Sequence, residues 1–153
     1  MIARAPTGTR GRHGETHRVF LDANVLFSAA YRADSALERL WTSNTDIALL
    51  SSPYAIEEAS RNLEERDARS RPRTLITALE IVPDIANGNI PPNVKLPDED
   101  LPILLAAIAA GATHLLTGDR AHFGAYFGRR AAGVLIQRPG DYLAARRLTD
   151  EQR

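Results

Sequence analysis

The chain contains 153 residues, 44% of them hydrophobic, and its formal net charge is zero at neutral pH. This length and composition suit one packed domain, and the balanced charge provides no overall basic field of the kind that marks many nucleic-acid-binding proteins. The absence of cysteine excludes a disulfide scaffold, a thiolate zinc site and a cysteine nucleophile.

The N-terminal segment, residues 1–17, is rich in Gly, Thr and Arg and has no hydrophobic periodicity. We predict a flexible tail there, a folded domain over residues 18–148 and a short C-terminal tail over 149–153. The N-terminal segment lacks the apolar core of a signal peptide. No run in the chain approaches the roughly 18 apolar residues that span a membrane. We therefore expect a cytoplasmic protein without a membrane partner.

Strands and helices alternate along the predicted domain. Short apolar runs predict buried strands, and capping residues or apolar residues at helical spacing predict the helices between them. The expected elements are a strand at 19–22, helices at 24–30 and 36–42, a strand at 47–50, a helix from 53, a helix at 74–79 running into an extended pair at 81–82, a loop at 84–97, a helix at 101–110, a strand at 114–117, a helix at 121–126, a strand at 134–137 and a helix at 139–148. This alternation predicts an α/β domain with a central parallel sheet of about four to five strands and helices on both faces.

Local signals support several of these boundaries. Asp34 and Ser35 resemble the N-cap of the helix at 36–42. Ser52 is a suitable N-cap for the next helix, and Pro53 fits its first position. Residues 66–73 form a charged break, and Gly111 is a suitable C-cap for the helix at 101–110.

Acidic residues recur where the predicted strands end or the predicted helices begin. They are Asp22, Glu57, Glu58, Asp98, Glu99, Asp100 and Asp119. In an open parallel sheet, the carboxyl ends of the strands form the ligand crevice. Carboxylates gathered there would repel one another unless a cation joined them, and hard divalent cations with oxygen ligands commonly do so.

Each acid also has a simpler interpretation. Asp22 and Asp119 can cap the helices that follow them, and the helix dipole favours acids such as Asp100 at a helix N-terminus. Glu57 and Glu58 can be ordinary solvated residues of a helix. The joint placement of these acids, rather than any single one, favours a site.

Other polar residues near these acids have candidate roles. Asn24 could hold the Asp22 carboxylate in place, and Thr117 could donate a hydrogen bond to the carboxylate of Asp22 or Asp119. The histidines do not have a zinc-binding spacing. We expect His114 to be a packed or edge residue of its strand and His122 to lie at the rim of the site without acting as a ligand.

Four sequence motifs contain these residues. They are Leu-Asp-Ala-Asn-Val-Leu-Phe-Ser-Ala from residue 21, Ser-Pro-Tyr-Ala-Ile-Glu-Glu-Ala-Ser-Arg-Asn-Leu from 52, Pro-Asp-Glu-Asp-Leu-Pro-Ile-Leu-Leu from 97, and Leu-Leu-Thr-Gly-Asp-Arg-Ala-His-Phe from 115. Together they resemble the PIN domain, a family of metal-dependent ribonucleases that includes VapC-type toxins. The resemblance extends from about residue 19 to residue 143.

The resemblance implies hydrolysis of RNA phosphodiester bonds with Mg²⁺ or Mn²⁺. The matching catalytic acids are Asp22, Glu58, Asp100 and Asp119, of which Asp22, Asp100 and Asp119 are the expected metal ligands. The supporting positions are Asn24, Thr117, Asp98 and Glu57, and the expected RNA-phosphate contacts are Arg120 and Arg61. The resemblance also implies an RNA substrate, an antitoxin protein as a partner and a homodimer, for which exposed apolar residues within 36–41 would be the interface.

Three other functions compete with this interpretation. One is a non-catalytic PIN-like module that binds RNA or protein. The second is a haloacid-dehalogenase-like phosphohydrolase, which would need an aspartate in place of Asn24 and a lysine near the later acids. The third, a receiver-type signalling module, also needs a lysine at a strand end. Lys95 is the only lysine and is not suitably placed.

Overall fold

A computed structural model describes residues 16–32, 36–42, 46–65 and 75–151, and it describes side chains as far as residue 146. The described chain forms a six-stranded sheet with the order β3-β2-β1-β4-β6-β5. The strands are β1 (His17–Leu21), β2 (Ile47–Ser51), β3 (Glu80–Ile81), β4 (His114–Leu116), β5 (Arg130–Ala131) and β6 (Val134–Gln137). All neighbouring strands are parallel except β5 and β6, which are antiparallel.

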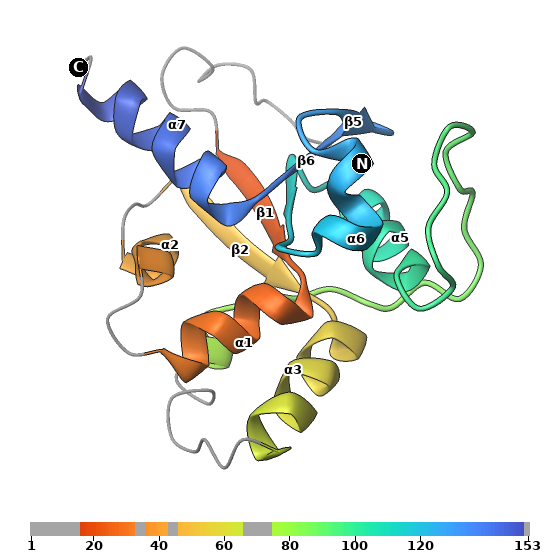
Figure 1. Ribbon diagram of the computed structural model, residues 1–153, viewed down its shortest axis with the longest axis horizontal. Helices are drawn as coiled ribbons and strands as arrows, with labels where there is room; N and C mark the ends of the chain where they lie inside the picture. The colour runs from red at the N-terminus through yellow and green to blue at the C-terminus, as the bar shows by residue number, and fades with distance from the viewer. Residues whose placement is uncertain (1–15, 33–35, 43–45, 66–74, 152–153) are drawn as a thin grey trace, which may run out of the picture.

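Helices flank this sheet (Figure 1). They are α1 (Ala23–Tyr31), η2 (Ala36–Glu38), α2 (Arg39–Thr42), α3 (Pro53–Glu65), α5 (Leu101–Ala109), α6 (Arg120–Phe123), η3 (Gly124–Tyr126) and α7 (Pro139–Glu151). The predicted α/β class with a mostly parallel sheet is confirmed. Within the described ranges, no helix is long and apolar enough to cross a lipid bilayer.

The boundaries differ from the predictions in several places. Strand β1 begins at His17, which we had assigned to the tail. The helices expected at 36–42 and 121–126 each divide into a 3₁₀ turn and a short α-helix. The cap at Asp34 and Ser35 and the charged break at 66–73 lie outside the described residues.

Strand β5 was not predicted, because its turn has an uncommon sequence. Ala131 pairs with Val134, so only two residues connect β5 and β6. Both residues of this turn, Ala132 and Gly133, have positive φ, at 49° and 87°. A type I′ hairpin turn requires this conformation, which Asn-Gly usually provides. An alanine at the first position gives no such signal in the sequence.

The central strands are buried on both faces. Val19, Phe20 and Leu21 of β1 and Leu115 and Leu116 of β4 are all fully buried. Parallel strands covered on both faces have such unbroken apolar runs. Residues that leave these strands at their carboxyl ends are therefore the first polar groups beyond the core.

The order of the strands places a topological switch point at the carboxyl ends of β1 and β4. From β1 the chain proceeds to β2 and β3 on one side, and it then returns to β4 on the other side of β1. The direction of winding thus reverses between β1 and β4. Ligands of open α/β sheets bind beyond the carboxyl ends of the strands at such a switch point.

An aromatic and imidazole cluster lies at the opposite, amino-terminal edge of the sheet. His17 and His114 begin the neighbouring strands β1 and β4, and their ring centroids are 4.6 Å apart. Tyr142 of α7 contacts both rings, and its hydroxyl lies 2.7 Å from His17 Nδ1. These contacts join the C-terminal helix to the sheet, and His114 is packed as predicted.

Acidification should weaken this cluster. Burial first, and then the positive charges of His17, Arg130 and Arg146, lower the pKa of His114 from 6.5 to about 4. Because the folded state favours the neutral ring, its contribution to stability is complete above pH 6.5 and is lost as the pH falls towards 4. We expect a loss on the order of 2 kcal/mol, after allowance for the partial exposure of the ring.

The measurement is the free energy of unfolding in urea at a series of pH values, for the parent and for His114→Gln. The difference between the two proteins removes the contribution of other titrating groups. The parent should lose more stability than the variant between pH 6.5 and 4. Parallel pH profiles would contradict the assignment.

Candidate active site

Asp22 directly follows β1 and is almost fully buried, with 5% of its surface exposed. Its backbone N–H donates to Leu116 O at 3.1 Å, which fixes it beside the end of β4. Its Oδ1 accepts a hydrogen bond from Ala23 N at 2.7 Å, so the predicted N-cap of α1 is confirmed. The cap uses only one carboxylate oxygen, which leaves Oδ2 for contacts across the sheet edge.

Thr117 and Asn24 hold this second oxygen. Thr117 Oγ1 donates to Asp22 Oδ2 at 2.8 Å, as predicted, and Asn24 Nδ2 donates to the same oxygen at 3.2 Å. Asn24 Oδ1 in turn accepts from Gly118 N at 2.8 Å, and Thr117 Oγ1 accepts from Asp119 N at 3.1 Å. The network joins the ends of β1 and β4 and fixes the orientation of the Asp22 carboxylate.

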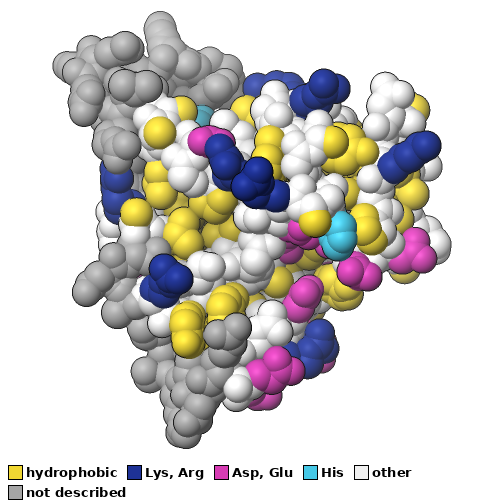
Figure 2. Space-filling view, in the orientation of Figure 1, with side chains coloured by type: hydrophobic (Ala, Val, Ile, Leu, Met, Phe, Trp, Pro, Cys, Tyr) yellow, Lys and Arg dark blue, Asp and Glu magenta, His cyan; other side chains and the backbone are white. Residues whose placement is uncertain are grey.

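Asp119 and Asp100 meet at His122. Asp119 caps α6 by accepting from His122 N at 3.1 Å through Oδ1. Its other oxygen, Oδ2, lies 3.0 Å from His122 Nδ1, and Asp100 Oδ2 lies 2.6 Å from the same nitrogen. Our prediction placed His122 only at the rim, whereas the ring lies between two of the predicted site acids. Figure 2 shows a histidine on the surface with several acidic side chains around it.

Asp100 occupies the N-cap position of α5 but makes no capping hydrogen bond with its side chain. Helix α5 begins at Leu101, directly after it, and the side chain of Asp100 is 13% exposed. Asp100 thus lies at the helix N-terminus, where the dipole favours its charge, but its carboxylate does not hydrogen-bond the first turn of α5. The Asp100 carboxylate is directed towards His122 instead.

Of the paired acids on α3, Glu58 faces the site. Burial first, and then the negative charges of Asp100, Glu99 and Asp119, raise its pKa, against the opposing charge of Arg61. Glu57 is 74% exposed at its side chain and forms only a 3.9 Å ion pair with Arg61. The sequence indicated both acids as candidates, and only the resemblance to the PIN domain favoured Glu58.

The helical phase of α3 also favours Glu58 over Glu57 as the residue that faces the site. The buried residues of α3 are Ala55, Ala59 and Leu63. At about 100° per residue, Glu57 lies roughly 200° from Ala59, on the opposite side of the helix. Glu58 lies only about 60° from the direction of Ala55 and therefore borders the buried face.

The charges at this edge of the sheet also affect Asp22 and Asp100. Burial raises the pKa of Asp22 to about 6, together with the charges of Glu58 and Asp100, although the hydrogen bonds from Thr117 and Ala23 oppose the shift. Burial and the charge of Asp119 raise the pKa of Asp100, and His122 opposes that shift. Four carboxylates from different segments therefore influence one another at a single place.

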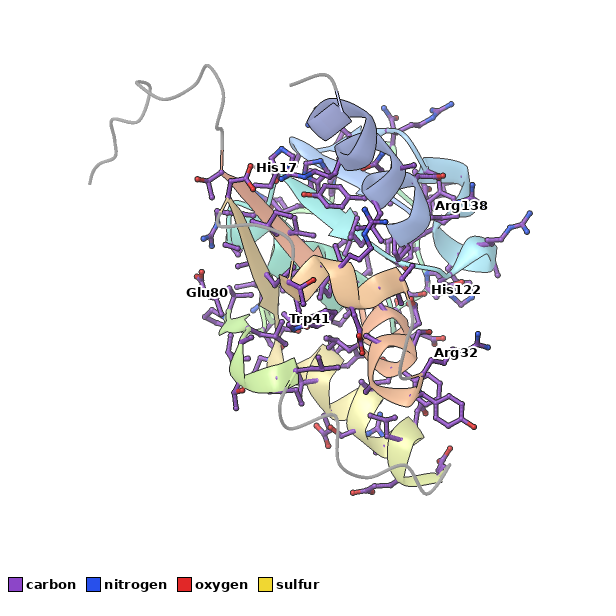
Figure 3. The ribbon with its side chains drawn as sticks, turned by 90° about the vertical axis from the view of Figure 1, so that its left-hand side faces the viewer. His17, Arg32, Trp41, Glu80, His122 and Arg138 are labelled. Atoms are coloured by element: carbon purple, nitrogen blue, oxygen red, sulfur yellow. The ribbon has the colours of Figure 1, made fainter. Side chains whose placement is uncertain are left out.

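The pKa of the His122 ring is also raised, but for an imidazole this favours the charged form. Burial favours its neutral form, but the charges of Asp119, Asp100 and Glu99 outweigh burial and raise the pKa. The acids around the ring thus favour its protonated form when no cation is bound. Figure 3 shows His122 and His17 at opposite edges of the sheet, so the two imidazole clusters are separate.

Tyr54 connects α3 to the acidic turn before α5. Its hydroxyl donates to Glu99 O at 2.8 Å, and its backbone N–H donates to Asp84 Oδ1 at 3.2 Å. Burial and the negative charges of Glu58, Asp100 and Glu99 raise the pKa of Tyr54. Tyr54 therefore links α3 to the segments around Asp84 and Glu99, next to the site acids.

The remaining predicted residues lie on the surface. Asp98 and Arg120 are exposed, and Arg61 belongs to the ion pair with Glu57. Arg138, which the sequence did not indicate, directly follows β6, whose last residue accepts a hydrogen bond from Thr117 N. Its Nε lies 3.1 Å from Asp141 Oδ2, and its side chain remains half exposed.

The donors present fit a divalent cation. Glu99, Asp100 and His122 each offer one ligand atom, and these atoms all lie within 4.8 Å of one another. Asp100 Oδ2 and His122 Nδ1 are buried atoms, and no hydrogen bond of acceptable geometry satisfies either of them among the described residues. Native structures rarely leave buried polar atoms without a partner, and a coordinated ion can supply that partner.

Comparisons with solved structures identify similar folds. One is a chain from the crystal structure of VapBC2 from Rickettsia felis bound to a DNA fragment from its promoter, with a TM-score of 0.57 and 17% identity over 79% of this chain and 98% of that chain. Another is Mycobacterium tuberculosis VapC20, described as a sarcin–ricin-loop-cleaving toxin, with a TM-score of 0.50 and 16% identity over 74% of this chain and 98% of that chain. At these identities the likeness concerns the fold alone.

No curated protein matches the sequence. The comparison with protein families matches the PIN domain over residues 18–121. That range contains all four predicted site acids and the switch point between β1 and β4. The chain therefore belongs to the PIN domain family.

Proposed function

We propose that this protein is a metal-dependent endoribonuclease of the VapC type, with Asp22, Glu58, Asp100 and Asp119 as its catalytic acids. The observation that carries the proposal is the convergence of these four acids, one from each motif, at the switch point of the sheet, where burial and mutual repulsion raise the pKa of several of them. Perturbed carboxylates in a crevice are typical of functional sites. The fold neighbours, one of which carries the description of an RNA-cleaving toxin, support the same class.

Asp22, Asp100 and Asp119 would hold Mg²⁺ or Mn²⁺, because hard cations take carboxylate oxygens as ligands. When bound, such a cation supplies Lewis acidity towards the phosphate and a more acidic water molecule as the nucleophile. Thr117 and Asn24 hold the Asp22 carboxylate in one orientation. Glu58, with its raised pKa, is suited to accept the proton of the attacking water.

The RNA strand would contact arginines around this edge of the sheet. Arg120 and Arg61 are exposed near the acids, and Arg138 leaves β6 at the same edge. Guanidinium groups suit phosphate, and contacts of this kind weaken with salt. Unpaired loops would fit best, since proteins read RNA sequence chiefly in single-stranded segments.

An antitoxin protein and a second copy of the chain are the proposed protein partners, in a cytoplasmic setting. The VapBC2 neighbour supports the antitoxin by its description alone. Within the expected dimer interface at 36–41, Leu40 is buried, whereas Leu37 and Trp41 are only partly buried against the core. The homodimer stays a prediction, and light scattering over a range of concentrations tests it.

Cleavage of a looped RNA by the purified protein is the direct test. We expect cleavage with Mg²⁺ or Mn²⁺ and none after addition of EDTA. RNA binding without cleavage in either metal would favour a non-catalytic module. Cleavage that continues in EDTA would exclude the proposed chemistry. A haloacid-dehalogenase-like function is disfavoured by Asn24, whose amide donates to Asp22 where that class needs an aspartate. A receiver-type function is disfavoured because Lys95, the only lysine of the sequence, does not lie at the end of a strand.

Glu58→Gln and Glu57→Gln form a matched pair on one helix. We expect Glu58→Gln to lower kcat by about 10²-fold or more, the usual contribution of a positioned general base. Glu57→Gln should leave kcat within about twofold, because the side chain of Glu57 is 74% exposed and faces away from the site. Single-turnover cleavage rates measure both effects, and equal losses in the two variants would remove Glu58 from the proposed role.

A further inference from the structure

We infer that His122 is a nitrogen ligand of the site cation and that the site therefore selects a first-row transition cation, such as Mn²⁺, over Mg²⁺. This inference rests on the proposed metal-dependent function and adds to it the chemical class of the metal. It concerns a residue that the sequence motifs of the acids did not indicate as a ligand.

The first observation is the position of the ring. His122 Nδ1 lies 2.6 Å from Asp100 Oδ2 and 3.0 Å from Asp119 Oδ2. Two ligands at right angles, each about 2.1 Å from a cation, are about 3 Å apart. Both distances from the ring nitrogen are therefore close to the separation of neighbouring ligands in one coordination shell.

The second observation is the burial of the closest pair of atoms. Asp100 Oδ2 and His122 Nδ1 are both buried, and apart from the ion pairs of this acidic cluster neither atom has a hydrogen-bond partner among the described residues. Native structures rarely leave buried polar atoms with so few partners, and a coordinated ion can supply one. The pair is therefore placed to share a cation.

The local fold explains why the ring points there. Asp119 caps the single turn of α6 with Oδ1, which accepts from His122 N at 3.1 Å. The cap places residues 119 and 122 on the same face of the turn, so Oδ2 and the imidazole meet on the side of the site. Residue 122 is thus positioned by the same cap that positions Asp119.

An imidazole ligand changes which metals bind best. Mg²⁺ prefers an octahedral set of oxygen ligands and retains its waters, whereas transition cations accept imidazole nitrogen readily. A site with one nitrogen among its carboxylates should hold Mn²⁺, Co²⁺ or Zn²⁺ more tightly than Mg²⁺. Mn²⁺ is the useful probe, because its coupling to a ligand nitrogen is detected by pulsed electron paramagnetic resonance.

The experiment measures metal binding by the full-length protein without RNA. Isothermal titration gives the dissociation constants of Mn²⁺ and Mg²⁺, and electron spin echo modulation of the Mn²⁺ complex detects a coordinated ¹⁴N nucleus. We expect ¹⁴N modulation in the parent and its loss in His122→Gln. The variant should bind Mn²⁺ about tenfold or more weakly, with a smaller change for Mg²⁺. His17→Gln is the matched control, because it makes the same substitution at the amino-terminal end of β1, away from the site. It should retain the ¹⁴N modulation and the affinities for both cations.

Several results would overturn the inference. One is an Mn²⁺ complex of the parent without ¹⁴N modulation, and another is an unchanged Mn²⁺-to-Mg²⁺ affinity ratio in His122→Gln. Asp22→Asn distinguishes a failure of the His122 role from a failure of the whole metal site. If the parent binds Mn²⁺, Asp22→Asn weakens that binding and no nitrogen is detected, then the metal site remains and only the role of His122 fails. If the parent binds neither cation, the proposed function fails as well.

Discussion

Asp22→Asn should lower the rate of RNA cleavage by about three orders of magnitude while the protein remains folded. The substitution removes a metal-binding charge at nearly constant volume. Metal-mediated charge stabilisation contributes several kcal/mol to the transition state, and each 1.36 kcal/mol corresponds to about tenfold in rate. The amide oxygen can still accept from Ala23 N, so the N-cap of α1 persists.

The stability of this variant should change little. Burial raises the pKa of Asp22 to about 6, so the ionised carboxylate is disfavoured in the metal-free fold and its removal is favourable. The new amide group opposes this gain, because it faces the donors of Thr117 and Asn24. Circular dichroism melts and single-turnover rates measure the two properties separately.

Asp46→Asn is the matched control for the Asp22 variant. Asp46 lies just before β2, at the opposite end of the sheet, where it forms an ion pair with Arg146 at 2.8 Å. Its substitution should leave the cleavage rate unchanged. If Asp22→Asn cleaved RNA as fast as the parent, the measured activity would come from another nuclease, and the assignment of this site would be lost.

Asp100→Asn should raise or preserve the melting temperature of the metal-free protein and abolish cleavage. Burial and the charge of Asp119 raise the pKa of Asp100, so its ionised form is disfavoured in the fold at neutral pH. Asn removes that charge, and no capping hydrogen bond is lost because Asp100 makes none. His122 keeps its contact with Asp119 at 3.0 Å.

In the presence of Mn²⁺, the parent should have the higher melting temperature of the two proteins. A ligand that binds only the folded state of a protein stabilises it by about 2.7 kcal/mol at a hundred times its dissociation constant. The variant lacks one ligand and should gain less. Melting curves in EDTA and in Mn²⁺ measure both effects. A clear drop of the variant's melting temperature in EDTA, with an unchanged Mn²⁺ shift, would assign Asp100 a purely structural role.

The sequence alone determined the class of fold and the positions of most site acids. Unbroken apolar runs such as Val19–Leu21 identify buried parallel strands, and the acids that follow them lie at the edge of the core. These signals are local, since each depends on a few neighbouring residues. The caps at Asp22 and Asp119 are local for the same reason, and both are present.

The tertiary structure alone decided which of these residues meet. His122 lies against Asp100, a residue of a distant turn, and Asp100 directs its carboxylate to that ring instead of capping α5. His17 joins β1 because its ring packs on Tyr142 of the last helix. Such contacts depend on how separate segments pack across the sheet, and no spacing within a single segment of the chain encodes them.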